Sequence, residues 1–285
     1  MRFRFLGTGT SSGVPAIACD CVVCTSTDPH NKRLRTGASV EFVDVTGRER
    51  VVLIDTTPDL RQQALTANLR RCDAIVYTHN HVDHVFGLDE VRRFNAVQRT
   101  PIDVYAEAHT MGSLRRVYEH IFDADRNVND SFVATLIAHE ITLEQPLDLF
   151  GMTFTPVRLL HGRLPILGFR IEPTAQLKAS FLKAAGADSP QTTSPFPLAY
   201  CTDVSAIPPE SWRQLRNLET LVLDALRHRK HPTHFTLDEA VRAADQIAAK
   251  HTWFIHMSHD MLHAETNESL PEGMSLAHDG LVLGE

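Results

Sequence analysis

The sequence contains no apolar run that approaches the length of a membrane span. Its 35 acidic residues outnumber its 28 lysines and arginines, and the formal net charge of −7 disfavours a broad nucleic-acid-binding surface. Residues 1–6 alternate as a strand does and lack the apolar core of a signal peptide. We therefore expect a cytoplasmic protein without a membrane partner, for which nucleic acid is a partner only as a small nucleotide or an RNA end.

Cysteine is scarce, and its five copies are an odd number. In a chain expected in the cytoplasm, this count argues against a framework of disulfides. Three of them, Cys19, Cys21 and Cys24, nevertheless fall within six residues. Three thiols at this spacing can converge on one zinc ion, which needs a fourth ligand from elsewhere in the chain. The alternative is a loop that carries free cysteines.

The segment 78–84 carries four strong metal ligands within six residues: His79, His81, Asp83 and His84. A strand-like apolar stretch precedes it at 74–77, and residues 87–94 have the pattern of a helix. In an extended segment His79 and His81 point the same way, and the two later ligands can face a second point. Imidazole and carboxylate together suit zinc, manganese or iron. The alternative is a histidine-rich surface loop.

Strands and helices alternate along the 285 residues, which predicts a layered α/β protein with a full hydrophobic core. Several expected strands end in a polar side chain of the metal-ligand type: Asp55, His79, His161, Asp203 and His256. In layered α/β folds, binding sites form at the carboxyl edge of the strands. We therefore expect these side chains to meet at one site.

Residues 173–196 differ in composition from the rest of the chain, because proline, serine, threonine and glutamine are frequent there. We interpret this segment as a surface insertion in a single domain that spans residues 1–285. The pattern leaves open whether the insertion covers the site or contributes to a homodimer.

The ligand pattern of the segment 78–84, followed in order by His161, Asp203 and His256, resembles the metallo-β-lactamase superfamily, and the resemblance covers nearly the whole chain. Four further segments are similar to one branch, the phosphodiesterases that accompany the carbon–phosphorus lyase pathway: 7–15, 19–24, 54–59 and 256–259. The resemblance implies a four-layer αβ/βα sandwich, with two mixed β-sheets face to face and helices on the outer faces.

The resemblance also implies roles for individual residues. His79, His81 and His161 would hold one divalent metal ion, and Asp83, His84 and His256 a second, with Asp203 bridging the two. His259 would complete a structural zinc site with the three clustered cysteines. Asp55 would orient a ligand histidine from behind. His234, just ahead of a helix, would be the general acid, and it is counted with Asp83 among the catalytic residues.

These roles imply a metal-dependent phosphodiesterase that acts on a small or cyclic phosphodiester. A hydroxide bridging two zinc or manganese ions would attack phosphorus, and His234 would give a proton to the leaving alkoxide. The expected partner is therefore a small phosphorylated substrate.

Three other functions remain open. An RNA-processing endonuclease of the tRNA 3′-processing type shares the ligand set, but the acidic charge and the absence of an evident basic arm count against it. A thioesterase of the glyoxalase II type leaves the cysteine cluster unexplained. A non-catalytic metal-binding protein would be expected to lack one of the ligands, and the sequence has them all.

Overall fold

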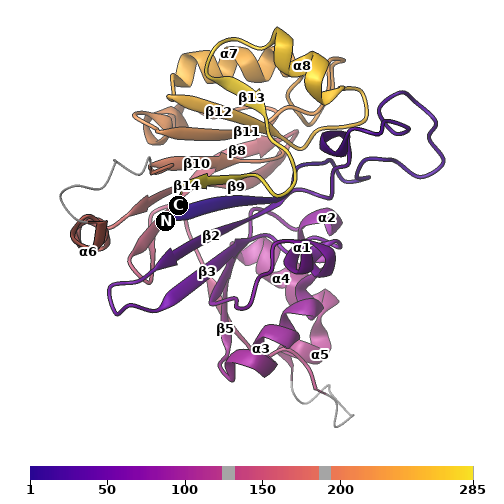
Figure 1. Ribbon diagram of the computed structural model, residues 1–285. Coiled ribbons are helices and arrows are strands. Elements are labelled where there is room, and N and C mark those ends of the chain that lie inside the picture. Colours follow the sequence, from indigo (N-terminus) through magenta and orange to yellow (C-terminus); the bar gives the residue numbers. More distant parts are fainter. Residues whose placement is uncertain (124–131, 186–193, 285) are drawn as a thin grey trace.

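The computed structural model describes residues 1–123, 132–185 and 194–284, and within them two seven-stranded sheets face each other (Figure 1). The first sheet contains, in spatial order, β14 (Val282–Gly284), β1 (Arg2–Gly7), β2 (Gly37–Val43), β3 (Glu49–Ile54), β4 (Ala74–Val76), β5 (Ile102–Ala106) and β6 (Leu136–Glu140). The second contains β13 (Met274–Leu276), β12 (His251–Ile255), β11 (Thr220–Asp224), β10 (Leu198–Cys201), β9 (Leu164–Pro173), β8 (Met152–His161) and β7 (Leu147–Leu149). Each sheet combines parallel and antiparallel pairs.

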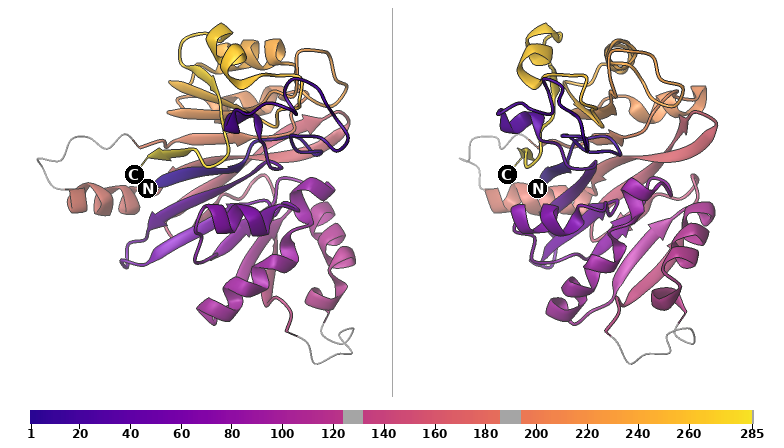
Figure 2. Two further views of the ribbon diagram at one scale, coloured as in Figure 1. Left: turned by 45° about the vertical axis from the view of Figure 1, so that its right-hand side comes forward. Right: turned by 90° about the vertical axis from the view of Figure 1, so that its right-hand side faces the viewer.

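Helices lie on the outer faces of both sheets (Figures 1 and 2). Those on the first sheet and its loops are α1 (Leu60–Thr66), α2 (Val82–Val85), α3 (Arg92–Gln98), α4 (Ala108–Val117) and α5 (Glu119–Phe122). The second sheet carries α7 (Leu237–Ile247) and α8 (His263–Ser269), and α6 (Ala175–Ala185) follows β9. Short 3-10 turns span Pro29–Asn31, Leu88–Val91 and Pro209–Leu215. In the described part of the chain, no helix is both long and apolar enough to cross a membrane.

Three apolar interfaces hold these layers together. Between the sheets, Phe3 and Phe5 of β1 pack in one cluster with Phe154 and Phe169 of the second sheet. Two further clusters join each sheet to its helices. Strand alternation explains the first interface, since inward phenylalanines alternate with arginines that pair with Glu41 on the opposite face. Three interfaces separate four layers, so the predicted αβ/βα sandwich with two mixed sheets is confirmed.

The helix expected at 87–94 is wrong in its bounds. Helix α2 begins earlier, at Val82, and the chain then continues through a 3-10 turn into α3. The break falls at Gly87, whose amide donates to Thr56 O at 2.9 Å. A Cβ atom there would lie only 2.0 Å from Thr57 O, so no other residue fits. Asp83 and His84 consequently sit on a helical turn that this contact fixes against the end of β3.

The structure modifies the interpretation of 173–196 as a surface insertion. Its first part forms α6, and Leu177 of this helix is buried in the cluster between the sheets. Phe196 is buried in the same cluster just before β10. Residues 186–193 lie outside the described residues.

Candidate metal centre

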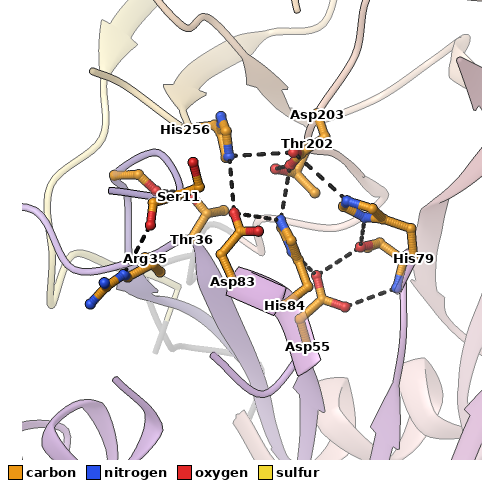
Figure 3. Close-up of polar contacts among 12 residues, drawn as sticks. Ser11, Arg35, Thr36, Asp55, His79, Asp83, His84, Thr202, Asp203 and His256 are labelled. Atoms are coloured by element: carbon orange, nitrogen blue, oxygen red, sulfur yellow. Dashed lines mark hydrogen bonds and ion pairs between the residues drawn. The ribbon is translucent and has the colours of Figure 1, made fainter. Parts of the chain in front are cut away.

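Strands of both sheets end at one rim of the sandwich, where polar side chains follow their last residues (Figure 3). Asp55 directly follows β3, and His256 directly follows β12. His161 is the last residue of β8. The expected ligands come together at this rim from the two sheets and from α2: His79, His81, Asp83, His84, His161, Asp203 and His256.

These side chains form two groups that share one carboxylate. The first contains His79, His81, His161 and Asp203, and the second contains Asp83, His84, Asp203 and His256. Within each group, the candidate ligand atoms lie within 4.8 Å of one another. Asp203 Oδ1 is 3.3 Å from His84 Nε2, whereas its Oδ2 is 3.8 Å from His79 Nε2. This arrangement is the one expected for two metal ions joined by a carboxylate.

Among the described residues, four imidazole nitrogens at the centre have no hydrogen-bond partner: Nε2 of His79, His84 and His256, and Nδ1 of His256. The Nε2 atoms of His79, His84 and His256 are buried, and each faces the shared carboxylate without making a hydrogen bond. Buried polar groups are nearly always paired, so these atoms need a partner. Imidazole nitrogens and carboxylate oxygens pointing at common centres fit divalent ions such as zinc or manganese.

The Nδ1 atoms of His79, His84 and His161 are held by the protein, whereas Nδ1 of His256 lies 3.4 Å from Asp224 Oδ1 without a hydrogen bond. Asp55 Oδ2 is 2.8 Å from His84 Nδ1 and accepts a hydrogen bond from the Thr78 hydroxyl, which in turn lies 3.0 Å from His79 Nδ1. His161 Nδ1 donates to the backbone oxygen of Thr233 at 2.8 Å. Protons fixed on Nδ1 leave Nε2 free as a ligand atom. Asp55 thus lies behind the ligands, in contact with His84.

Charge within the cluster shifts the pKa values of its histidines in opposite directions. Burial lowers the pKa of His84, but the carboxylates of Asp203 and Asp83 outweigh it and hold that pKa well above its usual value. Burial is likewise outweighed at His256, whose pKa the same two carboxylates raise to about 9. Burial holds the pKa of His79 well below its usual value. The carboxylates thus favour positive charge at His84 and His256, and bound cations would meet the same field.

Three residues of the site have a left-handed backbone. The φ angles of Asp55, Asp203 and His256 are 63°, 57° and 60°. All three lie one or two residues beyond the end of a strand. Non-glycine residues rarely adopt this conformation, and it concentrates at functional sites. The sharp turn places these side chains at the rim of the sandwich.

His234 lies beside the two ligand groups. Its ring centroid is 4.5 Å from that of His161 and 4.7 Å from that of His256, on which it stacks with a 13° interplanar angle. Its Nδ1 lies 3.3 Å from Asp224 Oδ2. His234 is 8% exposed, so it closes one side of the centre.

Asp224 is a site residue that the sequence analysis missed. It is fully buried at the end of β11, and its Oδ1 also lies 3.4 Å from His256 Nδ1. One carboxylate therefore contacts both His234 and a candidate ligand histidine. The available signal was a strand that ends in aspartate, the same pattern that marked Asp203.

The clustered cysteines meet His259 at a separate centre. The sulfurs of Cys19, Cys21 and Cys24 lie 3.1, 3.5 and 3.5 Å from His259 Nδ1. A hydrogen bond from the Cys24 amide lowers the pKa of Cys21 to about 6, whereas burial raises that of Cys24 to about 11. Three sulfurs and one imidazole nitrogen within 4.8 Å of one another match a tetrahedral zinc site. The remaining cysteines, Cys72 and Cys201, are buried in apolar clusters.

The segment 256–259 contributes His256 to the first centre and His259 to the second, and Arg33 binds its backbone. Arg33 is 1% exposed, and it donates hydrogen bonds at 2.8 Å to the backbone oxygens of Ser258 and Met261. The backbone of Met257 pairs with Thr8 and Thr10 of the segment 7–15. The position of His256 therefore depends on the same segment that carries His259.

Residues 50–257 match the family model described as "Beta-lactamase superfamily domain". The crystal structure of a diphosphatase from the PhnP family is 42% identical, covers 99% of this chain and 96% of its own, and superposes with a TM-score of 0.82. The zinc-bound structure of PqqB from Methylobacterium extorquens is 19% identical over 99% of both chains, with a TM-score of 0.73, and shows the fold alone.

A curated octanoyltransferase from Porphyromonas gingivalis is 34% identical over 283 residues, which are 99% of this chain but 51% of the relative. The chain spans about half the length of the curated relatives it matches. The family model covers most of the chain, and the 42% identical structure covers nearly all of it. The protein therefore belongs to the metallo-β-lactamase superfamily of hydrolases, and within that superfamily it is similar to the PhnP family.

Proposed function

We propose that this hydrolase is a metal-dependent phosphodiesterase that acts on small or cyclic phosphodiesters. The observation that carries the proposal is the position of His234 beside two ligand groups that share Asp203. Paired metal sites of this kind serve in-line displacement at phosphorus. A proton donor at their side is what a leaving alkoxide requires.

The two ligand groups would each hold one divalent ion, with Asp203 between them. The donor atoms suit zinc or manganese, and the related fold of PqqB is described as zinc-bound. When bound, such ions polarise the phosphoryl group and supply a nucleophile at neutral pH, because coordination lowers the pKa of water to about 7.

The protein's own side chains then orient the reaction. Asp224 fixes the ring of His234 through Nδ1, so that Nε2 is the atom able to give a proton to the leaving oxygen. Asp83 contacts His84 and His256 through Oδ2, at 3.3 and 3.7 Å. Its other oxygen has no partner among the described residues, and it can accept a hydrogen bond from the attacking water.

The cysteine centre would hold a third ion with a structural role. Its four donors leave no open position for a substrate, which distinguishes structural from catalytic zinc. The ion would hold the segment 256–259, and through it His256, in place.

Hydrolysis of a diphosphate bond is the second candidate. It is favoured by the 42% identity to a protein described as a diphosphatase. Both reactions break a P–O bond of a phosphoryl group that carries a second substituent, so the same centre serves either. The name of the octanoyltransferase describes a chain about twice as long, of which the match covers 51%.

The experiment is a comparison of substrate classes after metal removal and reloading with zinc or manganese. Bis(p-nitrophenyl) phosphate, 2′,3′-cyclic nucleotides, a dinucleoside diphosphate, a structured RNA and a thioester are supplied in parallel. We expect metal-dependent turnover of a phosphodiester. Turnover confined to the diphosphate favours the second candidate, and cleavage of RNA or thioester alone favours the other members of the superfamily. Metal-dependent turnover of no phosphodiester would refute the proposal, and Asp203→Asn controls for contaminating activity.

A further inference from the structure

A cavity of about 340 Å³ lies directly beside the metal centre and shares His79 with it. Its other walls come from the start of α4 and from the hairpin between β8 and β9: Asn80, Glu107, His109, Arg158, Leu164 and Pro165 among them. The volume is within the range of small-molecule sites, roughly 300–1,000 Å³. None of the roles assigned above uses this cavity.

The cavity lies away from the side at which the leaving group departs. His79 and His256 stand at opposite ends of the cluster (Figure 3). His234, the proton donor, stacks on His256 and also contacts His161. The bond to the leaving oxygen therefore points toward His234, while a cavity walled by His79 faces another substituent of phosphorus. That substituent is the ester group that stays on the product.

The lining of the cavity has no net charge. Glu107 and Arg158 are the lining residues charged at neutral pH, and they form a two-pronged pair in which Nη1 of Arg158 is 2.9 Å from Glu107 Oε2. Arg158 also donates to the backbone oxygen of Ile166. Because the Arg158 guanidinium is already bonded to Glu107 and Ile166, it does not offer a free positive charge to an anionic substituent. The carboxylate keeps lone pairs that can accept hydrogen bonds from hydroxyl groups.

Asn80 adds a second acceptor. Its Nδ2 donates to the Ser113 hydroxyl at 2.9 Å and lies 3.2 Å from His109 Nε2. Because that hydroxyl donates its own proton to a backbone oxygen, the amide of Asn80 must present nitrogen to it. The amide oxygen is then left without a partner among the described residues, in a side chain that lines the cavity. Leu164 and Pro165 give the cavity an apolar wall.

We propose that this cavity binds the ester substituent retained on phosphorus and selects a neutral, hydroxyl-bearing group such as a polyol or a sugar. The inference rests on the proposed function, whose substrate class it specifies. Hydroxyl protons meet Glu107 and Asn80, and the carbon skeleton lies on the apolar wall. A site built to accept hydroxyl protons disfavours an analogue that lacks them, because its acceptors are then left unpaired.

The test uses substrates that share the p-nitrophenyl leaving group and differ in the retained ester: 2,3-dihydroxypropyl, propyl and carboxyethyl. We expect kcat/KM to be about tenfold higher for dihydroxypropyl than for propyl, since each hydrogen bond contributes roughly threefold to tenfold. Glu107→Gln should remove most of this preference and improve the carboxyethyl ester, because Arg158 then loses its counter-charge. Calorimetry with glycerol 1-phosphate and propyl phosphate, the two products, should give the same ranking without turnover.

The matched control is Glu172→Gln, which alters the ion pair with Arg170 on the same hairpin, outside the lining of the cavity. This variant should retain the wild-type preference. Equal kcat/KM for dihydroxypropyl and propyl esters in the wild type would overturn the inference while leaving the phosphodiesterase intact. An equal loss for both esters in Glu107→Gln would also overturn it. Failure of the metal-loaded protein to hydrolyse any of the three esters would remove the proposed function, and the inference with it.

Discussion

Replacing His234 with alanine tests the proposed proton donor. His234 belongs to neither of the two groups that share Asp203, so His234→Ala should retain the same number of catalytic metal ions. The substitution removes the ring that stacks on His256 and frees the carboxylate of Asp224. Thermal unfolding should be recorded beside the kinetics, because truncating a buried ring costs about 2–4 kcal/mol of stability.

The size of the kinetic effect should depend on the leaving group. A well-placed general acid contributes roughly 10²–10⁴-fold when the leaving alkoxide needs a proton. p-Nitrophenolate leaves without one, so the loss for a p-nitrophenyl ester should stay below about tenfold. At the upper end, 10⁴-fold corresponds to about 5 kcal/mol of transition-state stabilisation.

The assay compares kcat/KM for a series of phosphodiesters with aryl and alkyl leaving groups, in wild type and His234→Ala. The dependence on leaving-group basicity should be steeper in the variant. His228→Ala is the matched control, since this exposed histidine of the same loop should change nothing. A uniform loss across the series, or loss of catalytic metal, would refute the assignment of His234 as proton donor.

Four further changes test other parts of the molecule. Asp224→Asn should lower turnover of alkyl esters about tenfold, because His234 then loses the carboxylate that orients its ring. The effect on p-nitrophenyl esters should be small, because their leaving group needs no proton. Cys21→Ser should reduce the metal content from about three ions per chain to two, measured by elemental analysis. Asp55→Asn should weaken metal binding roughly 10–100-fold in a chelator competition, because His84 loses its acceptor. Burial, with nearby positive groups, lowers the pKa of His263 from 6.5 to about 4. The stability that its neutral form contributes is present above pH 6.5 and is lost as the pH falls toward 4. In urea unfolding, the free energy of unfolding of wild type should fall by about 3 kcal/mol over that pH window, and His263→Gln should lack this loss.

The sequence predicted those parts of the centre that depend on local spacing and on strand ends. The ligands of the segment 78–84 lie at a short junction between a strand and a helix. Such a junction is encoded by one continuous stretch of sequence. His161, Asp203 and His256 were found because polar residues after buried strands share one edge of a layered fold. The alternation within residues 1–6 likewise predicted a strand, and the structure has β1 there, at Arg2–Gly7.

Other features depend on contacts between distant segments. The break after α2 is set by the approach of Gly87 to Thr57, thirty residues earlier, which no local pattern reports. His259 could be assigned to the cysteines only by resemblance, because 235 residues separate it from Cys24. The role of Asp224 depends on two histidines that approach it from different loops. These three features depend on packing between distant segments, so periodicity and local spacing could not predict them.

The left-handed backbone at Asp55, Asp203 and His256 has a consequence for engineering. Each such residue costs roughly 1–2 kcal/mol relative to glycine, and the cost is borne whether or not ions are present. A selection for melting temperature alone, made on chelated protein, would favour glycine wherever this cost exceeds that of the lost side-chain contacts, which it does not at Asp55, because its carboxylate pairs with Thr78 and His84. Such variants would gain heat resistance and lose the centre. Screens for robust forms of this hydrolase should therefore be made with metal present and should score turnover together with unfolding.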